Sequence, residues 1–302
     1  MTTRRDFLKQ MGVAAAGLGL APLGSLAAGP AGANKTKNTG GDKVKIAFIG
    51  IGNRGEQNVA EFERTGMIEV TALCDVDLKG KQTQKVQSKY PKAKLFTDFR
   101  EKYSQNFDAV VASTPDHSHF PIAMMALEYG KHIYLEKPMT RTFIEAELLM
   151  QKARSCPKVV TQVGNQGHSE ANYFQFKAWK EAGIIKDVTA ITAHMNNPRR
   201  WHSYDSKMYR LPSGDALPDG MNWDVWLGVC PWRDFSAKFH QGDWRSWYEF
   251  GMGALGDWGA HILDTAHEFL DLGLPYEVSL TYEKGHNDFF FPYSSTILFR
   301  FG

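Results

Sequence analysis

Polar residues at helical spacing in the last third of the chain have the side chains that proton transfer requires. Asp257 and His261 are four residues apart and Asp264 follows three later, so on one helix all three would share a face. Such a polar row would be costly in an ordinary apolar core. A carboxylate one turn from an imidazole can fix its tautomer and stabilise its protonated form. We therefore predict that His261 is a general base.

Two other interpretations of these residues stay open. Asp257, His261, Asp264 and His267 could hold a metal ion, but no H-E-x-x-H sequence and no cysteine ligands accompany them. His261 could also be a structural, hydrogen-bonded histidine. The acid–base interpretation is preferred, and no metal is predicted.

A glycine motif near residue 50 has the spacing that binds a pyrophosphate. Three glycines stand in the pattern G-x-G-x-x-G, directly after an apolar run over residues 46–49 that predicts a buried parallel strand. They allow a tight turn, close backbone approach to the pyrophosphate, and close packing of helix on strand. The helix expected over residues 56–64 would aim its free N–H groups at the phosphates. The predicted cofactor contacts of this turn are Gly50, Gly52, Asn53, Arg54 and Gly55.

An acid follows the next predicted strand, residues 68–74. Asp75 lies about twenty residues after the last glycine, where a carboxylate holds the adenosine ribose hydroxyls. A carboxylate there would repel a 2′-phosphate, so NAD is predicted and NADP is less favoured. The alternative is a turn in an α/β sheet that binds no ligand.

Polar loops also follow the two later strands predicted over residues 108–112 and 132–135. The carboxyl ends of parallel strands meet at the sheet edge where ligands bind. A lysine there, facing a nicotinamide ring, could donate a hydrogen bond to a reacting oxygen and stabilise its negative charge. Alone, it would be an ordinary surface lysine. The predicted cofactor contacts of these loops are Thr114, Pro115, His119, Glu136 and Lys137.

Alternating strands and helices must position these motifs. Further helices are expected over residues 79–90, 121–129 and 143–155, and a strand over 159–163. This order predicts a Rossmann doubly wound parallel sheet over residues 44–164. Beyond it the pattern changes and predicts a second α/β domain over residues 165–302, with a helix at 172–182, an irregular span at 196–250, and strands at 188–194, 277–282 and 294–301.

Composition excludes several classes of protein. The chain has 302 residues, 43% hydrophobic and 23% charged, which suits two domains with a sizeable core. A net charge of +2, with no basic run outside the extreme N-terminus, argues against nucleic-acid binding. The three cysteines are widely spaced and predict neither a disulfide framework nor a zinc motif. Cys74 is predicted to be a buried free thiol.

The N-terminus is predicted to be an export signal outside the fold. Residues 3–9 resemble a twin-arginine signal, followed by an apolar stretch over residues 11–21 and a small-residue cleavage site at 31–33. The apolar stretch is too short for a permanent membrane span. These features predict a signal peptide over residues 1–33, a linker over 34–43, the twin-arginine machinery as a partner, and a periplasmic protein. The alternative is an amphipathic helix with two chance arginines.

Four motifs together resemble the Gfo/Idh/MocA family of NAD(P)-dependent oxidoreductases. They are Gly50–Gly55, Thr114–His119, Glu136–Pro138 and Gly256–His261. The segments Asn222–Gly228 and Trp244–Trp247, with the export signal, resemble the exported bacterial subgroup of that family. The resemblance covers residues 44–301, nearly the whole mature chain.

The resemblance implies a second domain with an open, mainly antiparallel sheet that often mediates homo-oligomers. It also implies hydride transfer between a sugar, cyclitol or related polyol and the nicotinamide. On this mapping His261 takes the hydroxyl proton, Lys137 supports the oxygen and Asp257 orients His261. The expected substrate contacts are Lys137, Gln166, Arg245, Trp247, Asp257 and His261.

Three functions are compared on this basis. The first is an oxidoreductase with a tightly held cofactor, since free NAD is scarce outside the cytoplasm and twin-arginine export can carry a folded, loaded protein. The second is a redox-neutral glycosidase or lyase that acts through a transient keto-sugar. The third is a dinucleotide-dependent binding protein, which would not need the set of Lys137, Asp257 and His261. Because the chain stops on its third visible strand of the second sheet, it is also predicted to be truncated.

Overall fold

The computed structural model describes residues 43–302, except 102, 104–105, 196–206, 209 and 241. The predicted export signal and residues 34–42 of the predicted linker lie outside the described residues. The chain divides into two compact units. Unit 1 holds the described residues up to Val163 together with Ser213–Ser236, and unit 2 holds those of Gly164–Pro212 and Ala237–Gly302. No helix in the described part of the chain is long and apolar enough to cross a membrane.

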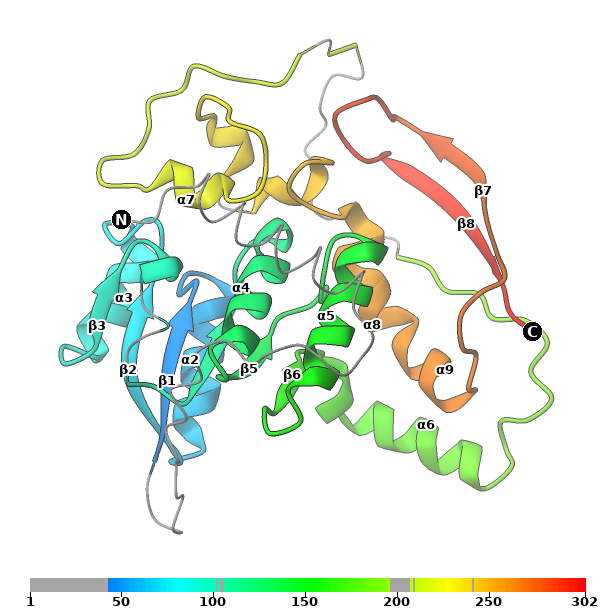
Figure 1. Cartoon of the computed structure of the whole chain (residues 1–302). Helices are drawn as coiled ribbons and strands as arrows, with labels where there is room; N and C mark the ends of the chain where they lie inside the picture. The colour runs from blue at the N-terminus through cyan, green and yellow to red at the C-terminus, as the bar shows by residue number, and fades with distance from the viewer. Residues whose placement is uncertain (1–42, 102, 104–105, 196–206, 209, 241) are drawn as a thin grey trace. The chain divides into compact units, whose positions relative to one another are not determined.

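Unit 1 is built on a six-stranded sheet with the strand order β3-β2-β1-β4-β5-β6 (Figure 1). All five neighbouring pairs are parallel. The strands are β1 (Val44–Ile49), β2 (Ile68–Cys74), β3 (Lys94–Phe96), β4 (Ala109–Ala112), β5 (His132–Leu135) and β6 (Thr161–Val163). The order reverses between β1 and β4, which is where open parallel sheets bind ligands. The predicted doubly wound sheet is therefore confirmed, and β3 is a strand that the sequence analysis missed.

Helices cover both faces of this sheet and explain the continuous apolar sequence of β1. They are α2 (Arg54–Arg64), α3 (Lys81–Lys89), α4 (Asp116–Glu128) and α5 (Phe143–Ser155). Phe48 belongs to a buried cluster with Val59 of α2 and Val86 of α3. Ile49, the next residue, belongs to a second cluster with Ile122 of α4 and Leu149 of α5. Successive side chains of a strand point to opposite faces, so burial on both sides requires an apolar residue at every position.

A distant segment, residues 213–236, belongs to unit 1 although the sequence analysis assigned it to the second domain. It contains the short helix α7 (Trp223–Leu227). The Asn222 N–H donates to the Val76 carbonyl oxygen at 2.8 Å, and the buried Val225 side chain joins the cluster beneath α4 and α5. The His117 ring nitrogen Nε2 hydrogen-bonds the Trp226 carbonyl oxygen at 2.6 Å. Burial of these apolar groups explains why the segment packs on the Rossmann sheet.

Unit 2 combines short helices with a two-stranded antiparallel sheet. Its elements are η2 (Gln166–Ser169), α6 (Ala171–Glu181), η3 (Ala237–Phe239), η4 (Asp243–Ser246), the π-helical turn η5 (Leu255–Gly259), α8 (Ala260–Ile262), α9 (Asp264–Phe269), β7 (Glu277–Lys284) and β8 (Ser294–Arg300). Its core contains four fully buried aromatic residues, Phe239, Trp247, Phe250 and Phe290.

Two expected elements differ from the structure. Residues 188–194 form no strand, because a strand needs a hydrogen-bonded neighbour and β7 and β8 pair only with each other among the described residues. The single helix expected around Asp257, His261 and Asp264 is instead the π turn η5 followed by α8 and α9. Such π turns occur frequently at functional sites.

Gly55 is predicted to tolerate no side chain. A Cβ atom there would lie 2.0 Å from the Gly50 carbonyl oxygen. We expect Gly55→Ala to lower the free energy of unfolding by about 1–3 kcal/mol through overpacking. Urea denaturation would measure this, with Ala60→Ser in the same helix as the control. Equal stability of the wild type and Gly55→Ala would contradict the close packing of α2 on the turn.

Candidate functional site

The glycine turn between β1 and α2 has the geometry of an anion-binding loop. Gly50 has φ +76°, and a Cβ atom on it would lie 2.5 Å from the Ser113 carbonyl oxygen. Both observations require glycine at this position. The first backbone N–H groups of α2 have no partner within the helix, and its dipole favours negative charge at this end. These features fit the pyrophosphate of a dinucleotide.

Asp75 lies just beyond β2 and connects that strand end to the glycine turn. Its Oδ2 accepts a hydrogen bond from the Ile51 N–H at 2.9 Å, and its Oδ1 accepts one from the Asp77 N–H at 3.0 Å. Burial raises the pKa of Asp75, and the backbone N–H groups partly oppose that rise. The carboxylate therefore has a fixed orientation beside the turn, at the place predicted for the ribose contact.

Gln82 of α3 hydrogen-bonds Asn53, where the same turn enters α2. Its Oε1 accepts from the Asn53 N–H at 3.2 Å, and its Nε2 donates to the Asn53 Oδ1 at 3.1 Å. Asn53 has φ 45°, in the left-handed region that favours glycine. The pair of hydrogen bonds holds this residue in place. Sequence reasoning missed Gln82, which lies 29 residues away and outside every motif.

A buried carboxylate, Glu136, joins three segments of the site. Its Oε1 accepts from the Arg54 Nε and from the Asn58 Nδ2, each at 2.9 Å. The same Asn58 nitrogen donates to the Ser113 Oγ at 2.8 Å. Burial would raise the pKa of Glu136, but the hydrogen bonds from Asn58 and Arg54 outweigh it and hold that pKa below its ordinary value. The Lys137 N–H also donates to the Glu136 Oε2 at 3.3 Å, which connects the backbone of Lys137 to α2 through the network. The bond between Lys137 and Pro138 is cis.

His119 links the two loops that follow β4 and β5. It is almost fully buried, and its Nδ1 and Nε2 lie 2.6 Å and 2.9 Å from the carbonyl oxygens of Pro138 and Thr114. Burial lowers the pKa of this histidine, against the effect of both carbonyls. In this structure His119 therefore positions the loops. All residues predicted to contact the cofactor, including Pro115 at the start of α4, lie within unit 1.

The predicted acid–base residues lie in unit 2 and have well-defined partners there. Asp257 is buried, and its Oδ1 accepts from the Arg245 Nε at 3.2 Å. The His261 Nδ1 lies 2.8 Å from the Asn165 Oδ1. The structure thus brings together two predicted residues, Arg245 and Asp257, and adds Asn165, which the sequence analysis did not select. The orientation of His261 by Asp257 stays a prediction.

The structure does not place the side chains of Trp247 and Gln166, two predicted substrate contacts, at a substrate site. Trp247 is 0% exposed, and its Nε1 donates to the Lys238 carbonyl oxygen at 2.9 Å. Its ring packs edge-on against Phe239 and Phe290, so in this structure Trp247 is a core residue. Gln166 is the first residue of η2, and its side chain lies outside the described part of the chain.

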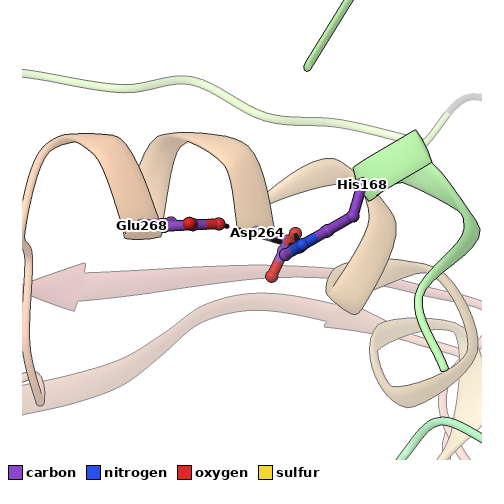
Figure 2. Close-up of side chains that lie close together, drawn as sticks. All are labelled: His168, Asp264 and Glu268. Atoms are coloured by element: carbon purple, nitrogen blue, oxygen red, sulfur yellow. Dashed lines mark hydrogen bonds and ion pairs between the residues drawn. The ribbon is translucent and has the colours of Figure 1, made fainter. Parts of the chain in front are cut away.

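Figure 2 shows a second polar cluster of unit 2, formed by His168, Asp264 and Glu268. The His168 Nε2 hydrogen-bonds the Asp264 carboxylate and lies 3.8 Å from the Glu268 Oε2. The Tyr173 hydroxyl donates to Glu268 at 2.9 Å, and its ring stacks on His168. Among the described residues this is the group whose ligand atoms lie close enough for a metal ion. It shares only Asp264 with the metal alternative considered above.

The contacts within this cluster give it a structural role. They join η2 and α6 to α9, because His168 and Tyr173 lie on the first two elements and both acids lie on the third. In the metal alternative considered above, His267 was a fourth ligand. The structure instead places its Nε2 2.7 Å from the Gly273 carbonyl oxygen.

The Glu136 network predicts a specific pH dependence of stability. A carboxyl group whose folded-state pKa is depressed stabilises the fold above its ordinary pKa of 4.5 and loses that contribution as pH falls through the folded value. At pH 7 we expect Glu136→Gln to lower the free energy of unfolding by about 1–3 kcal/mol. Urea titrations at pH 7 and at steps below pH 4.5 should show this difference shrinking. The exposed Glu147→Gln is the control, and a constant difference across pH would contradict the assignment.

Comparison with known proteins gives matches along most of the chain. Residues 44–164 match the family model described as "Oxidoreductase family, NAD-binding Rossmann fold", and residues 175–300 match "Oxidoreductase family, C-terminal alpha/beta domain". A glycosyl hydrolase family 109 protein of Shewanella pealeana is 32% identical over 237 residues, which are 66% of this chain and 51% of that protein. An inositol 2-dehydrogenase/D-chiro-inositol 3-dehydrogenase of Lactiplantibacillus plantarum is 25% identical over 197 residues, or 65% and 56% of the two chains. The chain spans about half the length of the curated relatives it matches.

Solved structures agree at the level of the fold. GenD2 from gentamicin A biosynthesis, in complex with NAD, has a TM-score of 0.61 at 16% identity, covering 94% of this chain and 66% of that one. The yvaA protein of Bacillus subtilis has a TM-score of 0.58 at 17% identity, covering 86% and 62%. Because both family models match in order, and the glycine turn and sheet have the Rossmann geometry, the chain belongs to the Gfo/Idh/MocA family of NAD-binding oxidoreductases.

Proposed function

We propose that this protein transfers a hydride between a hydroxyl-bearing carbon of a sugar, cyclitol or related polyol and a tightly held NAD. The observation that carries the proposal is the Arg54–Glu136–Asn58 network, which ties the segment bearing Lys137 to the phosphate-binding turn. A group that acts on reacting atoms must be held in a fixed position. An ordinary surface lysine needs no such support. The relative named as an inositol dehydrogenase supports a polyol substrate.

Three residues have assigned roles in this proposal. Bound NAD supplies the hydride acceptor. His261 takes the proton of the substrate hydroxyl as the hydride leaves the same carbon. The Lys137 ammonium donates a hydrogen bond to the substrate oxygen and stabilises the negative charge that develops there. Asp257, held by Arg245, supplies a fixed negative charge in the same unit as His261.

Tight retention of the cofactor belongs to the proposal. The predicted twin-arginine signal would deliver the protein to the periplasm, where free NAD is scarce. A retained cofactor must then return its hydride to a second acceptor in each cycle. We propose a homo-oligomer on the family resemblance alone.

We further propose that Asp75 selects NAD over NADP. Its carboxylate is fixed beside the glycine turn, and a 2′-phosphate placed there would meet a like charge. Calorimetry should give a dissociation constant for NAD at least about tenfold below that for NADP, corresponding to roughly 1.4 kcal/mol. Asp75→Asn keeps an oxygen that can accept the hydrogen bond from the Ile51 N–H, and it should bring the dissociation constants for NAD and NADP closer together. Asp77→Asn is the control. Equal affinity of the wild-type protein for both cofactors would refute this role.

The hydride-transfer proposal has a direct test. Purified protein is incubated with a panel of cyclitols, sugars and glycosides, then denatured, and the released nucleotide is measured by absorbance and mass spectrometry. We expect stoichiometric NAD before incubation and NADH after incubation with one substrate class. His261→Ala should abolish the conversion while the nucleotide content stays unchanged. Nucleotide that exchanges rapidly, or NAD that no polyol reduces, would contradict the proposal.

A redox-neutral glycosidase is the second candidate, and the glycosyl hydrolase family 109 relatives favour it. In that reaction oxidation of a sugar hydroxyl to a ketone acidifies a neighbouring C–H. Loss of this proton expels the glycosidic oxygen, water adds to the resulting double bond, and the hydride then returns to the ketone. The same incubation separates the two candidates, because release of free sugar with no net NADH identifies the glycosidase.

A further inference from the structure

We infer that Asn165 is a positioning residue that fixes the neutral His261 imidazole in the tautomer protonated at Nδ1. The lone pair is then on Nε2, which is the nitrogen that exchanges the proton. The catalytic role of this tautomer rests on the proposed function. The tautomer itself is a property of the resting protein and can be measured without turnover.

The Asn165 side-chain amide has one orientation that satisfies its neighbours. Its Nδ2 lies 2.8 Å from the Ala260 carbonyl oxygen. A carbonyl oxygen carries no proton and can only accept, so the amide nitrogen must face it. The opposite orientation would place two oxygens against each other. The Asn165 Oδ1 therefore points to its other partner, His261.

The orientation of the amide determines which nitrogen of the His261 imidazole carries a proton. The Asn165 Oδ1 lies 2.8 Å from the His261 Nδ1, and an amide oxygen can only accept a hydrogen bond. The His261 Nδ1 must therefore carry a proton in both the neutral and the charged ring. A neutral imidazole has one proton, so its Nε2 carries the lone pair. Proton uptake and release are thereby confined to Nε2.

The partner of the His261 Nδ1 is a neutral amide. A carboxylate at this position would also hold the proton on Nδ1, but its charge would favour the imidazolium and raise the pKa of His261. An amide fixes the tautomer without adding that charge. A general base needs its neutral form at the working pH, so this choice of partner suits the proposed role.

The surrounding elements hold Asn165 in reach. Asn165 directly precedes η2, and its two partners, Ala260 and His261, are consecutive residues of α8. The His168 hydrogen bond to Asp264 joins η2 to the first residue of α9 (Figure 2). Asp264 follows the last residue of α8, Ile262, by two positions. The polar cluster of Figure 2 thus helps to hold the Asn165 amide within hydrogen-bonding distance of the His261 imidazole.

The test is heteronuclear NMR of the ¹⁵N-labelled histidine rings in the whole chain, with His261→Gln used to assign the signals. We expect His261 of the wild type, when neutral, to show a protonated Nδ1 and an unprotonated Nε2. Asn165→Ala removes the oxygen that accepts from the His261 Nδ1 and should shift the ring toward the other tautomer. Asn165→Asp should keep the tautomer and raise the pKa of His261. The exposed Asn172→Ala is the control and should change neither property.

Two results would overturn the inference. One is a wild-type His261 protonated at Nε2 when neutral, which needs no variant to detect. The other is an unchanged tautomer in folded Asn165→Ala. Hydride transfer provides the second readout: Asn165→Ala should slow it about tenfold or more, and Asn165→Asp should move the acid limb of its pH profile to higher pH. If the tautomer behaves as expected but no polyol is ever oxidised, the positioning role stands and the proposed function fails.

Discussion

The requirement that a buried carboxylate be hydrogen-bonded governs the arrangement of unit 1. Glu136 loses its contact with water, and only donors from the protein can compensate for that loss. Arg54 and Asn58 provide them from the first turns of α2, so the helix that begins at the glycine turn is tied to the segment carrying Lys137. Asn58 extends the same connection to Ser113. One set of contacts thus connects the glycine turn to the segment of the proposed catalytic lysine.

In unit 2 the group that hydrogen-bonds two separate partners is a neutral amide, that of Asn165. Asn165 satisfies the Ala260 carbonyl and the His261 imidazole with the two ends of one amide. A charged partner would hold the ring equally well but would alter its protonation. The contrast has a physical reason. Glu136 only has to stay ionised and fixed, whereas a general base has to exchange a proton.

The sequence predicts the parts of this protein that depend on local patterns. The apolar run of β1, the three glycines and Asp75 each follow from chemistry within a few residues. The structure forms β1 from that run, places the glycine turn between β1 and α2, and places Asp75 directly after β2, as expected. Gln82, Asn58 and Asn165 could not be predicted in this way, because their partners lie 29, 78 and 96 residues away. Trp247 shows a different limit. An indole suits both a sugar-binding surface and a core, and only its complete burial decides between them. The strand wrongly predicted over residues 188–194 has the same origin, since strand formation depends on a neighbour that no local pattern specifies.

The two candidate functions differ in only part of the chemistry. Oxidation of a polyol and redox-neutral cleavage of a glycoside both begin with loss of a hydroxyl proton and of a hydride from one carbon. In the proposed reaction Lys137, His261 and Asn165 would serve that shared step, so their presence does not distinguish the two reactions. Cleavage further requires a base that removes the proton from the neighbouring carbon and a proton donor for the oxygen that leaves as the C–O bond breaks. A distinction between dehydrogenase and glycosidase must therefore come from residues that face the second carbon, so substrate placement would decide which of the two proposed reactions occurs.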